Sequence, residues 1–119
     1  MLAVGEHEFG SISDQALRMS NAFCGGVASS HDELCGAVSA GIMLIGDRYG
    51  RVSADADDAA SLAAAAAFRN RFIERFGATK CDDVRIPGKK CTWVVEDASR
   101  ILIDIMARDW NESVAAGAA

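Results

Sequence analysis

Four cysteines are the residues of this 119-residue chain with the most distinctive chemistry. They are Cys24, Cys35, Cys81 and Cys91, separated by ten, 45 and nine residues. No two of them form a CxxC pair, so the spacings typical of thioredoxin-like redox sites and zinc ribbons are absent. A thiol can exchange with a disulfide, ligate a metal or pack as a small hydrophobic side chain. The spacing alone leaves these three roles open.

Two of the cysteines are expected at helix starts. Cys35 falls in the first turn of a predicted helix, and Cys91 immediately precedes another and follows Lys89 and Lys90. The pKa of a thiol falls near a helix N-terminus or a cation, and the thiolate is the nucleophile. Acidic neighbours of Cys35 oppose this effect, so the direction of its pKa shift stays open. We expect Cys35 and Cys91 to be the reactive pair, followed by Cys81 and then Cys24 as redox candidates.

A metal site is the alternative role for the thiols. Four thiolates match the ligand count of an iron–sulfur cluster or a tetrahedral zinc site, and two chains of a dimer could share the ligands. In this alternative the metal ligands are Cys24, Cys35, Cys81 and Cys91. His7 and His31 are conceivable further ligands, but each fits better as an ordinary surface or capping residue. No other cofactor is indicated.

Helical periodicity dominates the chain. Half of the residues are hydrophobic, only 7% are aromatic, and alanine occurs 22 times, a balance that favours closely packed helices over a β-sandwich. We predict one all-α domain over 1–119, a bundle of four principal helices with residues 1–10 as a docked arm or helix end and 115–119 as a frayed tail. The predicted helices begin near residues 11–13, 32, 53 and 92, and the first three end at Gly25-Gly26, Gly50 and Gly77.

Individual residues support these boundaries. Ser30 and Glu33 have the spacing of a capping box, and Ser53 is the expected cap of the third helix. A short turn is expected around Cys81 and a loop at 86–88, and the last helix is expected to continue to about residue 113. Aromatic residues at helical spacing are expected in the core: Phe68, Phe72 and Phe76.

The helix over 32–49 is expected to be central and buried, because it is apolar nearly all round from residue 34 to 45. Its small residues form two pairs four positions apart and would let another helix approach closely: Gly36, Ala37, Ala40 and Gly41. Charge is also uneven, with a net −4 over residues 1–34 and +4 over residues 69–91. Together these features predict a homodimer.

Charge and hydropathy narrow the partners. The net charge of −5 and the pI of about 4.9 argue against nucleic acid. The longest strongly apolar run, 34–46, is too short to span a membrane, and no signal peptide is visible. We therefore expect a cytoplasmic protein, in which permanent structural disulfides would be unusual. No electron donor, acceptor or other redox partner is identified.

Residues 34–41, LCGAVSAG, resemble the signature of the redox-active C-GCAxxG-C-C family. The likeness extends over roughly residues 16–106 and includes the glycine loop at 22–27, the segment 42–50, the segment 72–77 before Cys81, and the segment 95–98 after Cys91. The signature's final glycine falls at Ala40, with Gly41 one position later. The family's first cysteine lies upstream of the glycine loop, whereas here Cys24 stands inside that loop.

The resemblance implies a small helical protein with a redox or electron-transfer role and no established substrate. A related domain is similar to part of a split-Soret-type cytochrome with an iron–sulfur centre, but this chain has no CxxCH haem-attachment motif. The first hypothesis is thiol–disulfide exchange or electron transfer through the cysteines. The alternatives are an iron–sulfur or other metal protein and a non-catalytic helical assembly module. A hydrolase is disfavoured, because neither a Ser-His-Asp nor a zinc-hydrolase spacing is present.

Overall fold

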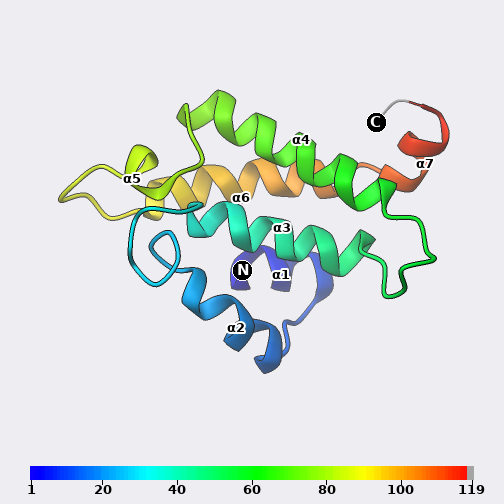
Figure 1. Cartoon of the computed structure of the whole chain (residues 1–119), viewed down its shortest axis with the longest axis horizontal. Coiled ribbons are helices and arrows are strands. Elements are labelled where there is room, and N and C mark those ends of the chain that lie inside the picture. Colours follow the sequence, from blue (N-terminus) through cyan, green and yellow to red (C-terminus); the bar gives the residue numbers. More distant parts are fainter. Residues whose placement is uncertain (118–119) are drawn as a thin grey trace.

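The computed structural model describes residues 1–117, and over this range the chain is helical with no named β-strand. Three long helices form the body: α3 (Gly36–Tyr49), α4 (Ala59–Phe76) and α6 (Thr92–Met106) (Figure 1). Shorter elements surround them: α1 (Leu2–Phe9), α2 (Asp14–Ser20), the 3-10 turn η1 (Asn21–Phe23), α5 (Cys81–Val84) and α7 (Trp110–Ala115). The all-α prediction is confirmed. Of the expected tail, residues 118 and 119 lie outside the described part.

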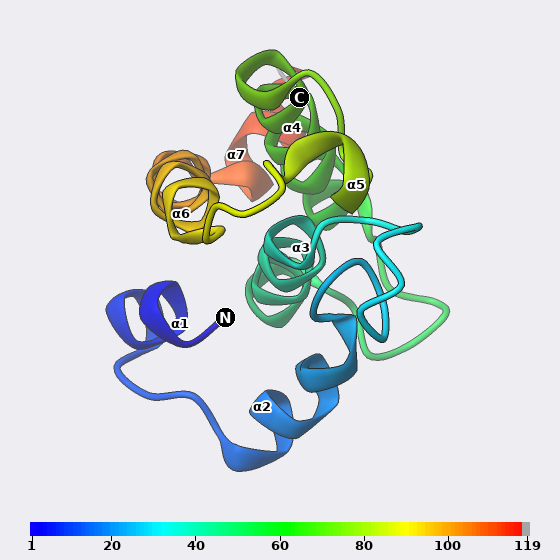
Figure 2. The same cartoon turned by 90° about the vertical axis from the view of Figure 1, so that its left-hand side faces the viewer.

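The three long helices pack against one another around the core. Viewed end-on, α3, α4 and α6 form a triangle, with α1 beside α6 and α2 below α3 (Figure 2). Phe68 and Phe72 of α4 are fully buried in the core between the three helices, and Phe76 is partly buried beside them. The aromatic residues therefore pack in the core, as predicted. α2 buries none of its residues completely and stands at the edge of the bundle.

Small residues of α3 allow close approach within the chain. The ring of Phe68 packs against Gly41 so closely that a Cβ atom at this glycine would overlap it. At the helix start, a Cβ on Gly36 would lie 3.3 Å from the carbonyl oxygen of Phe23, so the end of η1 abuts α3 there. The surface predicted to admit another helix is thus partly covered by α4 and η1 of the same chain.

Arg48 joins three elements at the other end of α3. Its guanidinium donates hydrogen bonds to the carbonyl oxygen of Met106 at the end of α6 (3.1 Å) and to the carbonyl and carboxylate oxygens of Glu8 in α1 (3.3 Å each). The same group lies over the ring of Phe9, 4.9 Å from its centroid. A cation at a helix C-terminus satisfies free carbonyl groups, so Arg48 fixes α1 and α6 against α3.

The predicted start of the second long helix was wrong by about four residues. α3 begins at Gly36, because residues 33–35 pair with a distant segment instead of continuing a helix. The capping box is also absent. The hydroxyl of Ser30 donates to the carbonyl oxygen of Gly26 and accepts from the N–H of Asp32.

Two further boundaries differ from prediction. α4 begins at Ala59, where the carboxylate of Asp57 accepts the backbone N–H (2.9 Å), and Ser53 caps nothing there. The last predicted helix is interrupted after Met106, because Asp109 caps a new helix and its carboxylate accepts the N–H of Glu112. The indole N–H of Trp110 donates to the carbonyl oxygen of Ile105 (2.7 Å), which ties the start of α7 to the end of α6, and α7 packs against α4.

Two glycines of α3 provide a matched test of this packing. Gly41→Ala should destabilise the protein by about 1–3 kcal/mol, because the new methyl group overlaps the buried Phe68 ring. Gly46→Ala, in the same helix but open to solvent, should stabilise it by up to about 1 kcal/mol through helix propensity. Denaturant unfolding measures both. Equal effects of the two substitutions would contradict the packing described.

Candidate functional site

A short backbone pairing creates the site by joining two segments far apart in the sequence. The N–H of Cys35 donates to the carbonyl oxygen of Thr79 (2.7 Å), and the N–H of Cys81 donates to that of Glu33 (2.8 Å). Leu34 and Lys80 form an isolated antiparallel bridge between them. The start of α3 is therefore held against the start of α5, with a cysteine on each side.

A left-handed turn precedes this pairing. Gly25, Gly26 and three following residues all have φ between 54° and 66°, as does His31: the non-glycine members are Val27, Ala28, Ser29 and His31. Each non-glycine residue costs roughly 1–2 kcal/mol in this region, so the turn is strained. Backbone hydrogen bonds offset part of the cost, among them Ala28 N–H to Ala22 (2.8 Å) and His31 N–H to Gly25 (2.9 Å). From the sequence, only the two glycines signalled it.

The turn lies directly against Cys81. A Cβ atom on Gly26 would stand 2.5 Å from the Cβ of Cys81, so only glycine permits this contact. The Nδ1 atom of His31 lies 3.4 Å from the sulfur of Cys81, and the carbonyl oxygen of His31 accepts the N–H of Asp82 (3.0 Å). His31 thus has a specific partner rather than being an ordinary surface or capping residue. Its spacing from Cys81, 50 residues away, gave no signal in the sequence.

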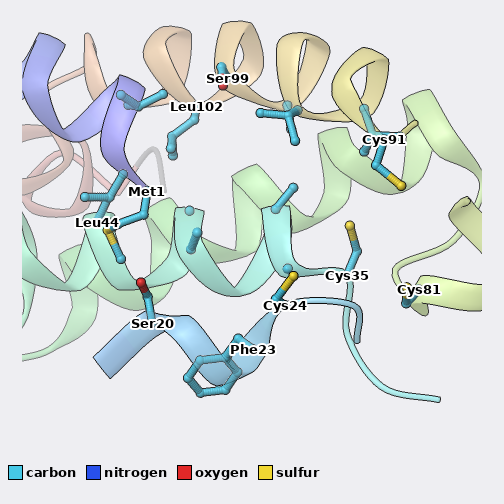
Figure 3. Close-up of a pocket in the computed structure, with 18 of the residues that line it drawn as sticks. Met1, Ser20, Phe23, Cys24, Cys35, Leu44, Cys81, Cys91, Ser99 and Leu102 are labelled. Atoms are coloured by element: carbon cyan, nitrogen blue, oxygen red, sulfur yellow. The ribbon is translucent and has the colours of Figure 1, made fainter. Parts of the chain in front are cut away.

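All four cysteines line one cavity of about 400 Å³ between α1, η1, α3 and α6. Figure 3 shows the sulfurs of Cys24, Cys35 and Cys91 toward one end of the cavity, and Met1 and Leu44 toward the other. Most of the remaining lining is apolar. Three residues with hydroxyl or amide groups interrupt it: Ser20, Asn21 and Ser99.

Cys35 and Cys91 stand at equivalent positions on two helices. Cys35 is the N-cap residue of α3, and Cys91 is the N-cap residue of α6. Their side chains point toward each other across the cavity (Figure 3). Cys35 is half-buried and Cys91 is exposed, so Cys35 is the inner thiol of the pair and Cys91 is the one that solvent reaches.

The other two cysteines differ in surroundings. Cys81 is buried, with 7% of its surface exposed, whereas Cys24 is exposed at the end of η1. Electrostatic interaction links Cys81 with Cys35 and Cys91. The structure therefore brings all four cysteines to one cavity, Cys35 from the start of α3, Cys91 from the start of α6, Cys81 from α5 and Cys24 from the end of η1.

Burial decides the acidity of the two inner thiols. Burial raises the pKa of Cys35, and the nearby N–H groups of Ala37 and Val38 at the start of α3 only partly oppose it. Burial also raises the pKa of Cys81, where negative charge on Cys35 and Cys91 acts in the same direction and Arg85 acts against it. The direction left open at Cys35 is thus upward, because desolvation outweighs the helix start.

The cysteines do not form a ready metal site in one chain. Thiolates are suitable ligands for zinc or an iron–sulfur cluster. However, within residues 1–117 no group of three or more cysteine, histidine or acidic side chains is arranged to hold a metal ion. No disulfide is formed either, and all four cysteines are free. The expected ligands share a cavity without converging on one point.

The fold and site define a small helical protein with a thiol-lined apolar cavity. A family model described as "Putative redox-active protein (C_GCAxxG_C_C)" matches residues 1–105. The chain therefore belongs to the C_GCAxxG_C_C family, which confirms the resemblance drawn from residues 34–41. No curated protein and no solved structure matches the chain. In the described residues, no helix is both long and apolar enough to cross a membrane, as predicted.

Alkylation rates should separate the cysteines by their surroundings. With iodoacetamide at pH 7, we expect Cys24 and Cys91 to react faster than Cys35 and Cys81, because burial restricts access to the inner pair and raises their pKa. The rates at Cys35 and Cys81 should still be increasing with pH where an ordinary thiol has already titrated. Peptide mass spectrometry of timed samples measures each rate. In denaturant the four rates should converge, and equal rates in the folded protein would refute the assignment.

Proposed function

We propose that the protein is a thiol–disulfide redox protein in which Cys35 and Cys91 alternate between a dithiol and a disulfide. The supporting observation is that these two N-cap cysteines, 56 residues apart in the chain, face each other across one cavity. Membership of a family described as redox-active agrees with this assignment. The specific reaction is the proposal and goes beyond that membership.

Exposure sets the order of the two thiols. Cys91 is exposed and begins α6, so its thiolate is placed to attack a substrate disulfide first. The attack forms a mixed disulfide and releases one substrate thiolate. The sulfur of Cys35 then attacks Cys91, forms the Cys35–Cys91 disulfide, gives up its proton and releases the second substrate thiolate. Two protein thiols are oxidised, and one substrate disulfide is reduced to two thiols.

Cys81 and His31 are proposed to assist at the inner end of the pair. The Nδ1 atom of His31 is within 3.4 Å of the Cys81 sulfur, close enough to accept a proton from it. A negative charge on Cys35 or Cys91 raises the pKa of Cys81. These charges and burial disfavour a Cys81 thiolate, so His31 is proposed to take the proton when Cys81 attacks a mixed disulfide at Cys91 that Cys35 has not resolved.

Assembly and compartment are part of the same proposal. We propose a homodimer, supported by the opposite net charges of residues 1–34 and 69–91. Two basic residues of the second segment form ion pairs within the chain, Arg71 with Asp104 and Arg75 with Asp97. Light scattering that gives the mass of one chain would refute the dimer. A cycling dithiol requires a reducing compartment, which supports the cytoplasm.

Disulfide formation tests the proposed function directly. Wild-type protein equilibrated in buffers of oxidised and reduced dithiothreitol should form one Cys35–Cys91 disulfide, detected by mass spectrometry of unreduced peptides. Cys35→Ser and Cys91→Ser should abolish it. Cys24→Ser is the matched control, because Cys24 lines the same cavity from the end of η1 but is not one of the two proposed partners, and it should leave the disulfide intact.

The alternatives give different results in the same preparation. Protein purified without oxygen that contains iron and acid-labile sulfide would favour the iron–sulfur alternative. The absence of any disulfide, together with wild-type behaviour of Cys35→Ser and Cys91→Ser in cells, would favour the assembly module. Either outcome would overturn the proposed thiol exchange.

A further inference from the structure

The cavity beside the cysteine pair has the size and lining of a small-molecule site. Its volume of about 400 Å³ lies within the roughly 300–1,000 Å³ typical of such sites. Apart from the cysteines its wall is mostly aliphatic and aromatic, formed chiefly by Val4, Leu44, Phe68, Val94, Ala98 and Leu102. Burying a polar or charged ligand against this wall would leave its polar groups without partners. The cavity therefore favours an apolar ligand.

A few polar groups interrupt the apolar wall. The hydroxyl of Ser99 lies on α6 and that of Ser20 on α2, on opposite sides of the cavity (Figure 3). The Ser20 hydroxyl donates to the carbonyl oxygen of Leu17, whereas within residues 1–117 the Ser99 hydroxyl forms no hydrogen bond. Asn21 supplies an amide on the η1 side. Ser99 and Asn21 can thus donate hydrogen bonds to a ligand that carries acceptor oxygens.

The entrance is also apolar. Phe23 on η1 and Val95 on α6 both line the cavity, yet 39% and 50% of their surfaces are exposed. Cys24 and Cys91, the two exposed cysteines, lie on the same two sides. A ligand entering between η1 and α6 would therefore pass apolar side chains and reach the thiols.

We infer that this cavity binds an apolar, ring-shaped electron acceptor of the quinone class, which the Cys35–Cys91 pair reduces. A quinone combines an apolar ring with two carbonyl oxygens, matching an apolar wall with hydroxyl and amide donors. The inference rests on the proposed function, because the same thiols supply the electrons. It adds the chemical class of the acceptor.

The reaction balances without another reactant. The two thiols lose two protons and two electrons as the S–S bond forms between Cys35 and Cys91. The quinone gains both protons and both electrons and becomes a hydroquinone, its two carbonyl oxygens becoming hydroxyl groups. A thiol donor would return the protein disulfide to the dithiol, as in other exchange reactions.

Ala40 offers a way to close the cavity without touching a cysteine. It lies on α3 and lines the cavity, and both Ala and Leu are good helix formers, so Ala40→Leu should fill the space and preserve the helix. Ala66→Leu makes the same change at an exposed position of α4 outside the cavity. It is the matched control.

The test uses duroquinone, a tetramethyl quinone whose ring positions are all blocked against addition of thiols. Reduced wild-type protein, mixed with it anaerobically, should convert one quinone per chain to hydroquinone, followed by absorbance, while two thiols are lost. Ala40→Leu should slow this reaction at least about tenfold, because the larger side chain occupies the space that the quinone would fill. Ala66→Leu should leave the rate unchanged. Bis(2-hydroxyethyl) disulfide, a small polar oxidant, should react alike with the wild-type protein and Ala66→Leu.

The outcomes separate this inference from the proposed function. If the polar disulfide oxidises Cys35–Cys91 but duroquinone is not reduced, or Ala40→Leu reduces it at the wild-type rate, the quinone inference is overturned and thiol exchange stands. If neither oxidant forms the disulfide, both fail. Should Ala40→Leu not fold, naphthalene added to the wild-type protein replaces it. If naphthalene saturably inhibits the reduction of duroquinone but not the reaction with the polar disulfide, binding of the quinone in the cavity is supported. If it inhibits neither reaction, the quinone inference is refuted.

Discussion

The pairing between the start of α3 and the start of α5 is the constraint on which the site depends. Two backbone hydrogen bonds, from Cys35 to Thr79 and from Cys81 to Glu33, join segments about 45 residues apart. Closing so long a segment costs conformational entropy, which the packing of α3 against α4 offsets. Once the two segments are joined, Cys35 and Cys81 lie in one group, and Cys91 completes it from the start of α6.

Burial and helix geometry compete at the thiols. A helix N-terminus stabilises a thiolate, and both Cys35 and Cys91 occupy that position. At Cys35, however, loss of water contact disfavours the charged form more strongly, and the pKa rises. In the proposed exchange reaction, this difference makes the exposed Cys91 the attacking thiol and the half-buried, less acidic Cys35 the resolving thiol.

Glycines in the strained turn and in α3 allow close packing against residues that line the cavity. The turn over residues 25–31, left-handed at 25–29 and at His31, packs against Cys81 and brings His31 to its sulfur, and Gly26 permits the contact. On α3, Gly41 accepts the Phe68 ring and Ala40 faces the cavity. Strain in a backbone persists where surrounding contacts hold it, and here those contacts are the hydrogen bonds within the turn and the packing of Gly26 and His31 against Cys81.

The sequence by itself determined the helical class, the buried phenylalanines of α4, the end of α4 at Gly77, and the placing of Cys35 and Cys91 at helix starts, because these follow from local periodicity and from glycine's freedom at positive φ. It also pointed to the family. Only the tertiary structure decided that α3 begins at Gly36, that His31 meets Cys81, and that burial raises the pKa of Cys35. These depend on contacts between segments distant in sequence and on exclusion of water, which no local pattern records.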